Sequence, residues 1–339
     1  MNLLRQGITS SQFFLWGKKA FTSTGYYNHI KSYTHPVQNS AVAPAPDADG
    51  VDLSGKTVLI TGANSGIGKE IATYAAAKNA VVYMLCRNAE RAETAKSDII
   101  SQTNNNNVKV LLGDVSEPEH IRRIANEFGD QKLDVLICNA GALFNERRVN
   151  SDGKEVTLMS HLVCGSYQLT KLMLPKLKAA DNEARVIYVS SGGMYNSKFP
   201  SWEQAASTGD YESKYDGNFA YTYAKRGQVL LAERFAKEFP EITFLSCHPG
   251  WTATTGVEAA YGDDAKWLNP LRTGWEGSEG ICWLMSTAAT NLKSGEFYLD
   301  REVQKKHIGG LFMSEGSFTK NSSAEVDEMM KRLQEEVGV

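Results

Sequence analysis

The sequence has few cysteines, little net charge and no long hydrophobic run, and each of these absences excludes a class of protein. Its 339 residues include five cysteines, which are scattered and form no Cys-x-x-Cys pair. They are typical of reduced core thiols in an intracellular protein, and we expect no metal site. The formal net charge of -3 argues against a general nucleic-acid binder. No apolar run reaches the roughly 18–20 residues that a membrane-spanning helix needs, whereas a hydrophobic content of 42% suffices for a full core.

Acidic residues are also missing from the first 46 residues, although four basic residues lie there: Arg5, Lys18, Lys19 and Lys31. An apolar run, Phe13 to Trp16, precedes the lysine pair. This pattern is typical of an amphipathic helix that contacts lipid or a partner protein, of a mitochondrial transit peptide, or of a helix packed on the body of the protein. The three interpretations stay open. The chain is therefore expected in the cytoplasm, at a membrane surface or in mitochondria, with residues 1–35 as the candidate contact to a membrane or a protein complex.

A change of composition separates this leader from the rest of the chain. Residues 36–50 are rich in proline and small residues, which is typical of a linker. From Val51 onward, strand-like and helix-like segments alternate. We predict strands at Thr57–Ile60, Val81–Cys86, Val108–Leu112, Val135–Cys138, Arg185–Val189, Thr243–Cys247 and Glu296–Leu299. Predicted helices between them include Glu90–Gln102, Glu117–Phe128, Gly165–Lys178, Tyr221–Phe239 and Glu276–Ser286.

Several of these strands are apolar throughout, as strands covered on both faces must be. The expected fold is therefore α/β, with a single Rossmann-type, doubly wound parallel sheet over residues 51–310. Residues 1–50 are expected to form the basic leader and linker, and residues 311–339 a C-terminal helical tail. In that tail Ser322 and Glu325 have capping-box spacing, and an apolar stripe follows at helical intervals. We expect this stripe to dock on the core.

The most informative motif is the glycine-rich stretch from Thr61 to Gly68, which lies between a predicted strand and a helical segment. A strand, a glycine turn and a helix in this order bring a dinucleotide pyrophosphate onto a helix N-terminus. The first glycine can form the tight turn, the second lets the backbone approach phosphate, and the third lets the helix pack on the strand. The expected cofactor contacts in this turn are Gly62, Asn64, Ser65, Gly66, Ile67 and Gly68.

The end of the second predicted strand indicates which cofactor binds. An NAD site favours an acidic residue near this point, which accepts from the ribose 2′-hydroxyl group. Arg87 stands there instead, and a guanidinium can pair with a 2′-phosphate. The sequence therefore predicts NADP (NADPH) in preference to NAD.

Two further strand ends are expected at the cofactor. Asp114 and Val115 follow the third strand, where the aspartate can accept from the adenine amino group. Asn139, Ala140 and Gly141 follow the fourth strand, where small residues let the backbone lie close to the cofactor. Asn139 can also brace the neighbouring strands.

Candidate catalytic residues lie at the end of the fifth strand and on the helix that follows. Ser190 and Ser191 end the strand, and strand alternation indicates that one of them faces the cleft. Tyr221 and Lys225 are four residues apart and share a helix face. Tyrosine is a poor acid–base catalyst at its reference pKa of about 10, but a nearby ammonium and an oxidised nicotinamide both draw that pKa toward neutrality. A strand-end serine can donate to a substrate carbonyl oxygen where charge develops.

Taken together, these motifs resemble the short-chain dehydrogenase/reductase family over roughly residues 51–308. The matching residues are the glycine turn at 61–68, Asn-Ala-Gly at 139–141, Ser191, and Tyr221 with Lys225. A closer resemblance to one subgroup rests on the stretches 189–194, 248–251 and 294–301, together with Thr254. The segment 21–31 also resembles the leader of that subgroup, which favours a surface helix over a cleaved presequence.

The resemblance implies a role for each candidate residue. Tyr221 would be the general acid/base and Ser191 the donor that orients the substrate; the family pattern, rather than alternation, selects Ser191. Lys225 would lower the pKa of the tyrosine and hold the nicotinamide ribose, so Tyr221 and Lys225 also count as cofactor-binding residues. Pro249, Gly250 and Thr254 would flank the nicotinamide.

One departure from the family pattern concerns the proton relay. Family members usually carry an asparagine on the helix after the Asn-Ala-Gly strand, and its backbone carbonyl holds a relay water. Alignment from Asp152 places His161 at this position, whereas alignment from Gly165 places Leu162 there. The change bears on relay efficiency rather than on activity as such, and a neutral, packed histidine is the expected state.

Aromatic residues dominate the two segments that border the expected substrate cleft: Tyr195, Phe199, Trp202, Tyr211, Tyr215, Phe219, Trp251, Tyr261, Trp267 and Trp275. Either they pack the loops or they bind a lipophilic carbonyl or alcohol. We expect an NADPH-dependent oxidoreductase that acts on such a small molecule. The alternative is a catalytically weak or inactive reductase-fold subunit of a larger assembly.

Overall fold

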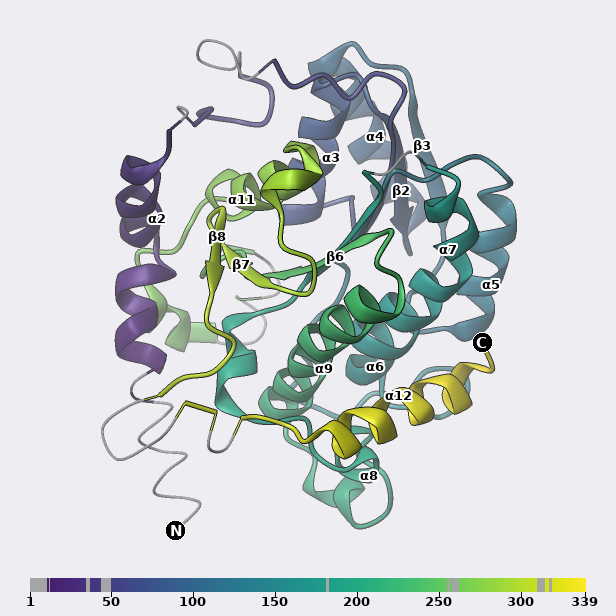
Figure 1. Ribbon diagram of the computed structural model, residues 1–339, viewed down its shortest axis with the longest axis vertical. Coiled ribbons are helices and arrows are strands. Elements are labelled where there is room, and N and C mark those ends of the chain that lie inside the picture. The colour runs from purple at the N-terminus through teal and green to yellow at the C-terminus, as the bar shows by residue number, and fades with distance from the viewer. Residues whose placement is uncertain are drawn as a thin grey trace.

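The computed structural model describes residues 11, 13–34, 37–43, 50–180, 183–254, 257, 262–309, 315–316 and 319–339. Eight strands form one sheet in the order β3-β2-β1-β4-β5-β6-β7-β8 (Figure 1). All neighbouring strands are parallel except β7 and β8. The strands are β1 Thr57–Thr61, β2 Val81–Cys86, β3 Val108–Leu112, β4 Val135–Cys138, β5 Arg185–Val189, β6 Thr243–Cys247, β7 Phe297–Leu299 and β8 Glu302–Gln304. This is the doubly wound α/β fold that the sequence predicts.

Helices cover both faces of the sheet, so the side chains of one strand alternate between two cores. In β1, Val58 and Ile60 lie in one core and Leu59 in the other. The first core includes residues of α3 Gly66–Ala77, α4 Ala89–Thr103 and α11 Gly274–Ser286. The second includes residues of α5 Pro118–Glu127, α7 Leu169–Lys178 and α9 Gly217–Glu238.

The C-terminal helix α12, Ser323–Val337, docks on the second core through its apolar stripe, as the sequence predicts. Met329, Leu333 and Val337 are buried there. Its N-terminus has the predicted capping box, in which Ser322 and Glu325 each accept from the other's backbone N–H.

Strand β8 is a strand that the sequence patterns did not indicate. It is short and mostly exposed, so it has no buried apolar alternation. The turn before it uses Asp300 and Arg301, which both have positive φ, at 49° and 70°. A two-residue hairpin loop favours such conformations, but the usual Asn-Gly or Asp-Gly signal is absent here.

A π-helix, η2, spans Met159–Gln168 between the short helix α6, Val156–Leu158, and α7. All ten of its residues are buried. The sequence predicted helix only from Gly165 onward. In this geometry a β-carbon on Gly165 would lie only 1.8 Å from the Ser160 carbonyl oxygen, so a side chain is excluded there. π-Helical segments are rare and are often found at functional sites.

The N-terminal segment packs on the body of the protein, which is the third of the three interpretations. Residues 13–20 are helical, and α2, Ser23–His29, follows them and ends in a 3-10 turn at Ile30–Ser32. Ala20 and Phe21 join a core cluster with Tyr195 and Phe297. Figure 1 shows α2 at the edge of the molecule beside β8 and α11.

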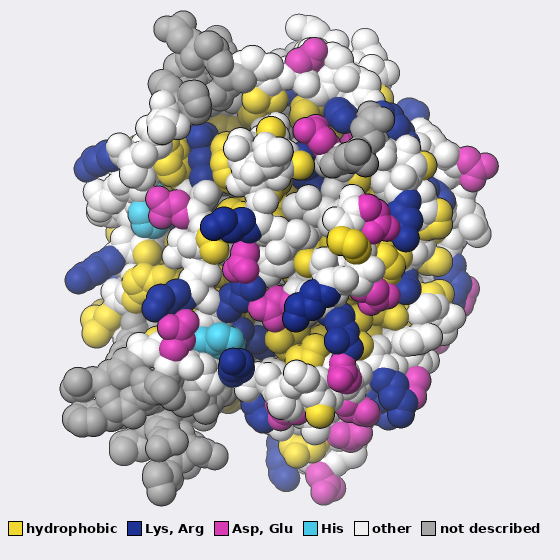
Figure 2. Space-filling view, viewed as in Figure 1, with side chains coloured by type: hydrophobic (Ala, Val, Ile, Leu, Met, Phe, Trp, Pro, Cys, Tyr) yellow, Lys and Arg dark blue, Asp and Glu magenta, His cyan; other side chains and the backbone are white. Residues whose placement is uncertain are grey.

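The linker is also partly docked, since the backbone carbonyl of Gln38 accepts from Trp275 Nε1 at 2.7 Å. No helix within the described ranges is both long and apolar enough to cross a bilayer. Basic and acidic side chains are interspersed on the face shown in Figure 2.

Candidate active site

The glycine turn between β1 and α3 forms a tight cradle. Gly62 has a φ of 70°, which favours glycine, and its carbonyl oxygen would lie 2.3 Å from a β-carbon on Gly68. Helix α3 therefore packs directly on the turn, as the motif predicts. Its N-cap, Ser65, makes no side-chain capping bond to the described part of the chain. The first N–H groups of α3 are thus available for an anion.

Asn139 braces β4 against β1, as the sequence predicts. Its side-chain amide donates to the Thr61 carbonyl oxygen at 2.9 Å. The backbone N–H groups of Asn139 and Ala140 both donate to Thr61 Oγ1, at 2.9 and 2.8 Å. Gly141 lies against the ring of His161, which a β-carbon would approach to 1.8 Å. The hydrogen bonds to Thr61 therefore hold the backbone after β4 close to the glycine turn.

The ends of β2 and β3 bring two predicted cofactor residues together. Arg87 Nη1 lies 3.8 Å from Asp114 Oδ2, and the Arg87 side chain is 70% exposed. The other carboxylate oxygen of Asp114 accepts from the N–H and hydroxyl of Ser116, at 2.9 and 2.7 Å. Val115, in contrast, is buried in the core, so only its backbone can face a cofactor.

A groove beside the glycine turn contains basic residues that the motif analysis missed. Its lining residues are Asn64, Lys69, Glu90, Arg91, Thr94, Ala95 and Asp98. Arg91 lies in the first turn of α4, four residues after Arg87, and this spacing is the signal that could have identified it.

Ser191 and Tyr221 both lie beside Gly193. A β-carbon built on Gly193 would lie 3.6 Å from Ser191 Oγ and 3.7 Å from Tyr221 Cε1. Both side chains are half-buried. Ser190, the other candidate, is buried and its hydroxyl donates to the Lys225 carbonyl oxygen at 2.8 Å. The structure thus places Ser191, and not Ser190, next to the tyrosine.

Lys225 lies deep beneath Tyr221, with its Nζ 5.4 Å from the centroid of the tyrosine ring. The ammonium donates to the Val189 carbonyl oxygen at 2.7 Å and to Gln228 Oε1 at 3.1 Å. Burial lowers the pKa of Lys225 to about 7. Helix α9 begins four residues before the predicted start, because Asp216 caps it through the N–H groups of Asn218 and Phe219.

His161, and not Leu162, faces this site. Its ring packs edge-to-face on Tyr221, with centroids 5.2 Å apart, whereas Leu162 packs against Gly227 in the core. Burial, followed by the charge of Lys225, lowers the pKa of His161 well below its ordinary value. The histidine is therefore neutral, as expected.

Gln228 connects the lysine to the π-helix, a link that the sequence analysis missed. Its amide nitrogen donates to the His161 carbonyl oxygen at 2.9 Å and to Ser166 Oγ at 3.0 Å, while its oxygen accepts from Lys225. All of these groups are buried. The spacing of three residues between Lys225 and Gln228 is the only sequence signal for the contact.

The turn after β6 completes the site. Gly250 has a φ of 76°, and a β-carbon there would lie 2.2 Å from Arg272 Nε, so a side chain is excluded. Pro249 precedes it and accepts from Thr252 Oγ1 at 3.0 Å. Thr254 Cγ2 lies 3.6 Å from a β-carbon built on Gly66, which places this threonine over the glycine turn.

Comparisons with known proteins identify the family of this chain. Residues 56–203 match the model of the short chain dehydrogenase family. The chain is 35% identical to dehydrogenase/reductase SDR family member 12 of Homo sapiens over 302 residues, which cover 87% of this chain and 89% of that protein.

The chain belongs to the short-chain dehydrogenase/reductase family.

The motif resemblance is thus confirmed, and so is the subgroup resemblance, which was to dehydrogenase/reductase SDR family member 12. Retinol dehydrogenase 12 of Homo sapiens is 38% identical over 205 residues, or 59% of this chain and 62% of that one. Among solved structures, a putative short chain dehydrogenase from Escherichia coli, complexed with NADPH, has a TM-score of 0.58 and 21% identity. It covers 74% of this chain and 98% of its own. The family match and the curated relatives make this chain a member of a family of oxidoreductases.

The aromatic residues near the site of this short-chain dehydrogenase/reductase serve several purposes. Phe199, Trp202 and Trp275 are buried packing residues. Tyr211, Phe219 and Trp267 are exposed, and Tyr215 donates to the Phe144 carbonyl oxygen. Tyr261 lies outside the described residues. Of the described aromatic residues, the fully buried Tyr195 and the partly buried Trp251 lie in the cluster that contacts the N-terminal segment.

Proposed function

We propose that this chain is an NADPH-dependent carbonyl reductase, reversible as an alcohol dehydrogenase, with Tyr221 as its general acid/base. One observation supports this most strongly: Ser191 Oγ and Tyr221 Cε1 lie 3.6 and 3.7 Å from the position that a β-carbon on Gly193 would occupy. A serine hydroxyl and a tyrosine ring that lie this close to one position would both be within reach of one carbonyl oxygen. The Lys225 ammonium lies under the phenol ring.

The residues fit a nicotinamide dinucleotide. The cradle of Gly62, Gly66 and Gly68 leaves the N-terminus of α3 open to a pyrophosphate. Asp114 would accept from the adenine amino group. The backbone of Asn139 to Gly141 would lie against the ribose, and Thr254 would lie beside the pyrophosphate and nicotinamide. When bound, the cofactor supplies or accepts the hydride.

The chain's own residues then handle the proton and the developing charge. Ser191 donates a hydrogen bond to the carbonyl oxygen and so stabilises negative charge there. Tyr221 delivers its phenolic proton to the same oxygen as the alcohol forms, and takes it back in the reverse direction. A charged Lys225 stabilises the resulting phenolate.

A lipophilic substrate is the proposed class. Support comes from Trp251, which follows the Pro249–Gly250 turn and is only partly buried, and from the resemblance to a protein named retinol dehydrogenase 12. With NADPH present, we expect kcat/KM for decanal to exceed that for acetaldehyde by about tenfold or more, because each buried methylene stabilises the bound state. A spectrophotometric assay of NADPH oxidation over a panel of aldehydes and ketones measures this. Equal rates, or a preference for small polar ketones, would contradict the lipophilic class.

Arg87 is expected to set the preference for NADPH. Arg87→Glu should weaken NADPH binding about 10- to 100-fold, since a charged hydrogen bond to a phosphate contributes roughly 1.5–3 kcal/mol. NADH binding should be unchanged or stronger. Titration of protein fluorescence with each cofactor tests this, with Arg332→Ala on α12 as a control for loss of positive charge. An unchanged ratio of the two dissociation constants would remove Arg87 from the site.

A second candidate is a catalytically weak, NADP-binding subunit of an assembly. Gln228 favours it, because its amide occupies the His161 carbonyl oxygen and links it directly to Lys225. An amide relays protons poorly. Tight NADP binding without turnover of any carbonyl in the panel would support this candidate against the reductase.

A further inference from the structure

We propose that the N-terminal helix at residues 13–20 forms one wall of the substrate cleft, and that Phe13 contacts the apolar part of the substrate. This inference rests on the proposed reductase function, since it assigns a substrate contact to that same site. It also makes the N-terminal segment a permanent part of the enzyme rather than a presequence.

Phe13 packs beside Gly192, and the proposed catalytic pair lies beside the next residue, Gly193. A β-carbon on Gly192 would lie 2.9 Å from Phe13 Cε2, while a β-carbon on the next residue, Gly193, would meet Ser191 and Tyr221. Phe13 therefore packs on Gly192, together with His248, while Ser191 and Tyr221 lie beside the next residue, Gly193. A side chain at position 192 would collide with Phe13, so Gly192 is what permits this approach.

The ring of Phe13 also bridges the two loops that flank the catalytic residues. Its centroid lies 6.2 Å from that of Tyr195, in the loop after β5, and 6.3 Å from that of Trp251, in the turn after β6. Phe14 contacts Trp251 as well, at 5.8 Å. A substrate whose carbonyl group lies between Ser191 and Tyr221 and whose tail leaves between these loops would meet the partly buried rings of Phe13 and Trp251 there. Such a lining suits an apolar chain or ring.

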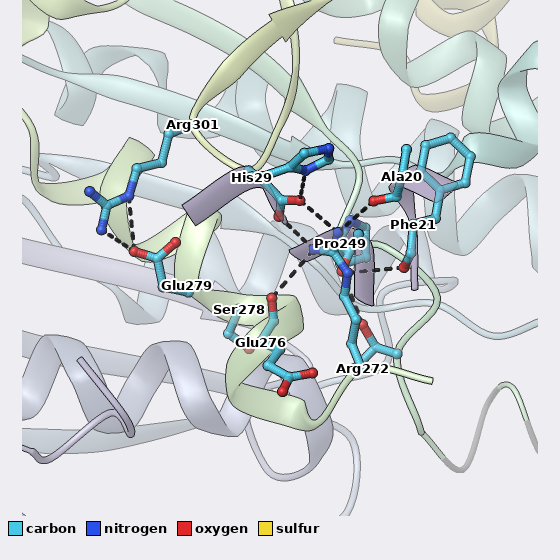
Figure 3. A network of polar contacts seen from close by, with 12 residues as sticks. Ala20, Phe21, His29, Pro249, Arg272, Glu276, Ser278, Glu279 and Arg301 are labelled. Atoms are coloured by element: carbon cyan, nitrogen blue, oxygen red, sulfur yellow. Dashed lines mark hydrogen bonds and ion pairs between the residues drawn. The ribbon is translucent and has the colours of Figure 1, made fainter. Parts of the chain in front are cut away.

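Backbone contacts hold the segment in register with the turn after β6. Figure 3 shows Arg272 between the carbonyl groups of Ala20 and Phe21, to which its guanidinium donates at 2.9 Å each. Trp251 N donates to the Phe21 carbonyl oxygen at 2.7 Å, and Arg272 N donates to the Trp251 carbonyl oxygen at 2.7 Å. Because the same residues position Gly250, the helix and the turn form one unit.

An ion pair fastens this unit to the hairpin after β7. Arg272 and Asp300 are almost completely buried and pair through both carboxylate oxygens, at 2.5 and 2.6 Å. His29 Nδ1 lies 2.7 Å from the same carboxylate, and Tyr33 donates to the Asp300 carbonyl oxygen. Burial by itself would raise the pKa of Asp300, but the charge of Arg272 and the hydrogen bond from His29 outweigh it and lower the pKa. Removal of the segment would therefore expose or unpair a buried charge cluster.

The test compares Phe13→Ala with Leu15→Ala in the full chain. Leu15 is on the same helix but is 66% exposed, so it controls for the loss of an apolar side chain. With NADPH, Phe13→Ala should lower kcat/KM for decanal about tenfold and leave kcat/KM for acetaldehyde unchanged, because only the long substrate reaches the wall. Leu15→Ala should change neither value. An unchanged ratio of the two values in Phe13→Ala would overturn the proposal.

Two further measurements keep this result separate from the proposed function and from folding. Calorimetric titration of the NADP-loaded protein with decanol measures the affinity for an apolar ligand without turnover. Phe13→Ala should weaken decanol binding about tenfold, even in a chain that reduces no carbonyl. Decanol binding that is equal in Phe13→Ala and Leu15→Ala, or absent from the parent chain, would overturn the proposal that Phe13 lines the cleft. If Phe13→Ala lowers the melting temperature, Phe13→Trp serves instead. Its larger ring should shift the preference toward acetaldehyde, and no shift would count against the proposal.

Discussion

Tyr221→Phe should lower kcat for carbonyl reduction by about 10²- to 10⁴-fold, the range expected when a general acid is removed. The substitution deletes the phenolic proton donor and keeps the ring that packs against His161. Lys225 retains its bonds to Val189 and Gln228, so the helix should keep its position. The dissociation constant for NADPH should therefore stay within about twofold of the parent value, since no pyrophosphate or adenine contact is lost. Steady-state NADPH oxidation and fluorescence titration measure the two quantities.

Tyr223→Phe is the matched control for this experiment. It removes a tyrosine hydroxyl two residues along the same helix, where the group accepts from Gln204 Nε2 at 2.9 Å. We expect its kcat to stay near that of the parent. Comparable turnover in Tyr221→Phe and the parent would show that another group delivers the proton.

Arg272→Met should destabilise the folded chain by about 3–5 kcal/mol, the usual cost of removing one partner of a buried ion pair. The substitution leaves the Asp300 carboxylate buried and removes the donor to the carbonyl groups of Ala20 and Phe21. Urea unfolding, followed by tryptophan fluorescence, gives the free energy of unfolding.

Lys305→Met is the control, because Lys305 forms an ion pair with Glu315 in which both side chains are solvent-exposed. Such exposed pairs contribute about 0–1 kcal/mol. The double variant Arg272→Met with Asp300→Leu should recover part of the lost stability, since no buried charge is then unpaired. A loss below about 1 kcal/mol in Arg272→Met would mean that the cluster does not hold the N-terminal segment.

The parallel strands could be predicted from the sequence because each is a short apolar, β-branched run between turn signals. β1 extends one residue further than expected, to Thr61, and β7 begins one residue later, at Phe297. Strand β8 could not be predicted, since an exposed strand after Asp300 and Arg301 has neither a buried alternation nor a glycine turn.

The candidate site residues could be placed together because most of their motifs follow strand ends, which meet at one edge of a parallel sheet, and because Tyr221 and Lys225 lie on the helix that joins two of these strands. The contacts of the residues around them could not be predicted from the sequence. Arg272 contacts Ala20 across 252 positions of sequence, and no local pattern indicates such a contact. The amphipathic character of residues 13–20 likewise showed that one face is apolar, but not that Tyr195 and Trp251 cover it.

The most direct test of the account is hydride transfer itself. NADPH with deuterium at the reactive nicotinamide carbon, on the face from which hydride leaves, is incubated with the purified chain and decanal. Mass spectrometry then follows the decanol formed. The account predicts one deuterium on the alcohol carbon, formed at a rate that collapses in Tyr221→Phe. Tight NADPH binding with no labelled alcohol from decanal or any other carbonyl in the panel would contradict it.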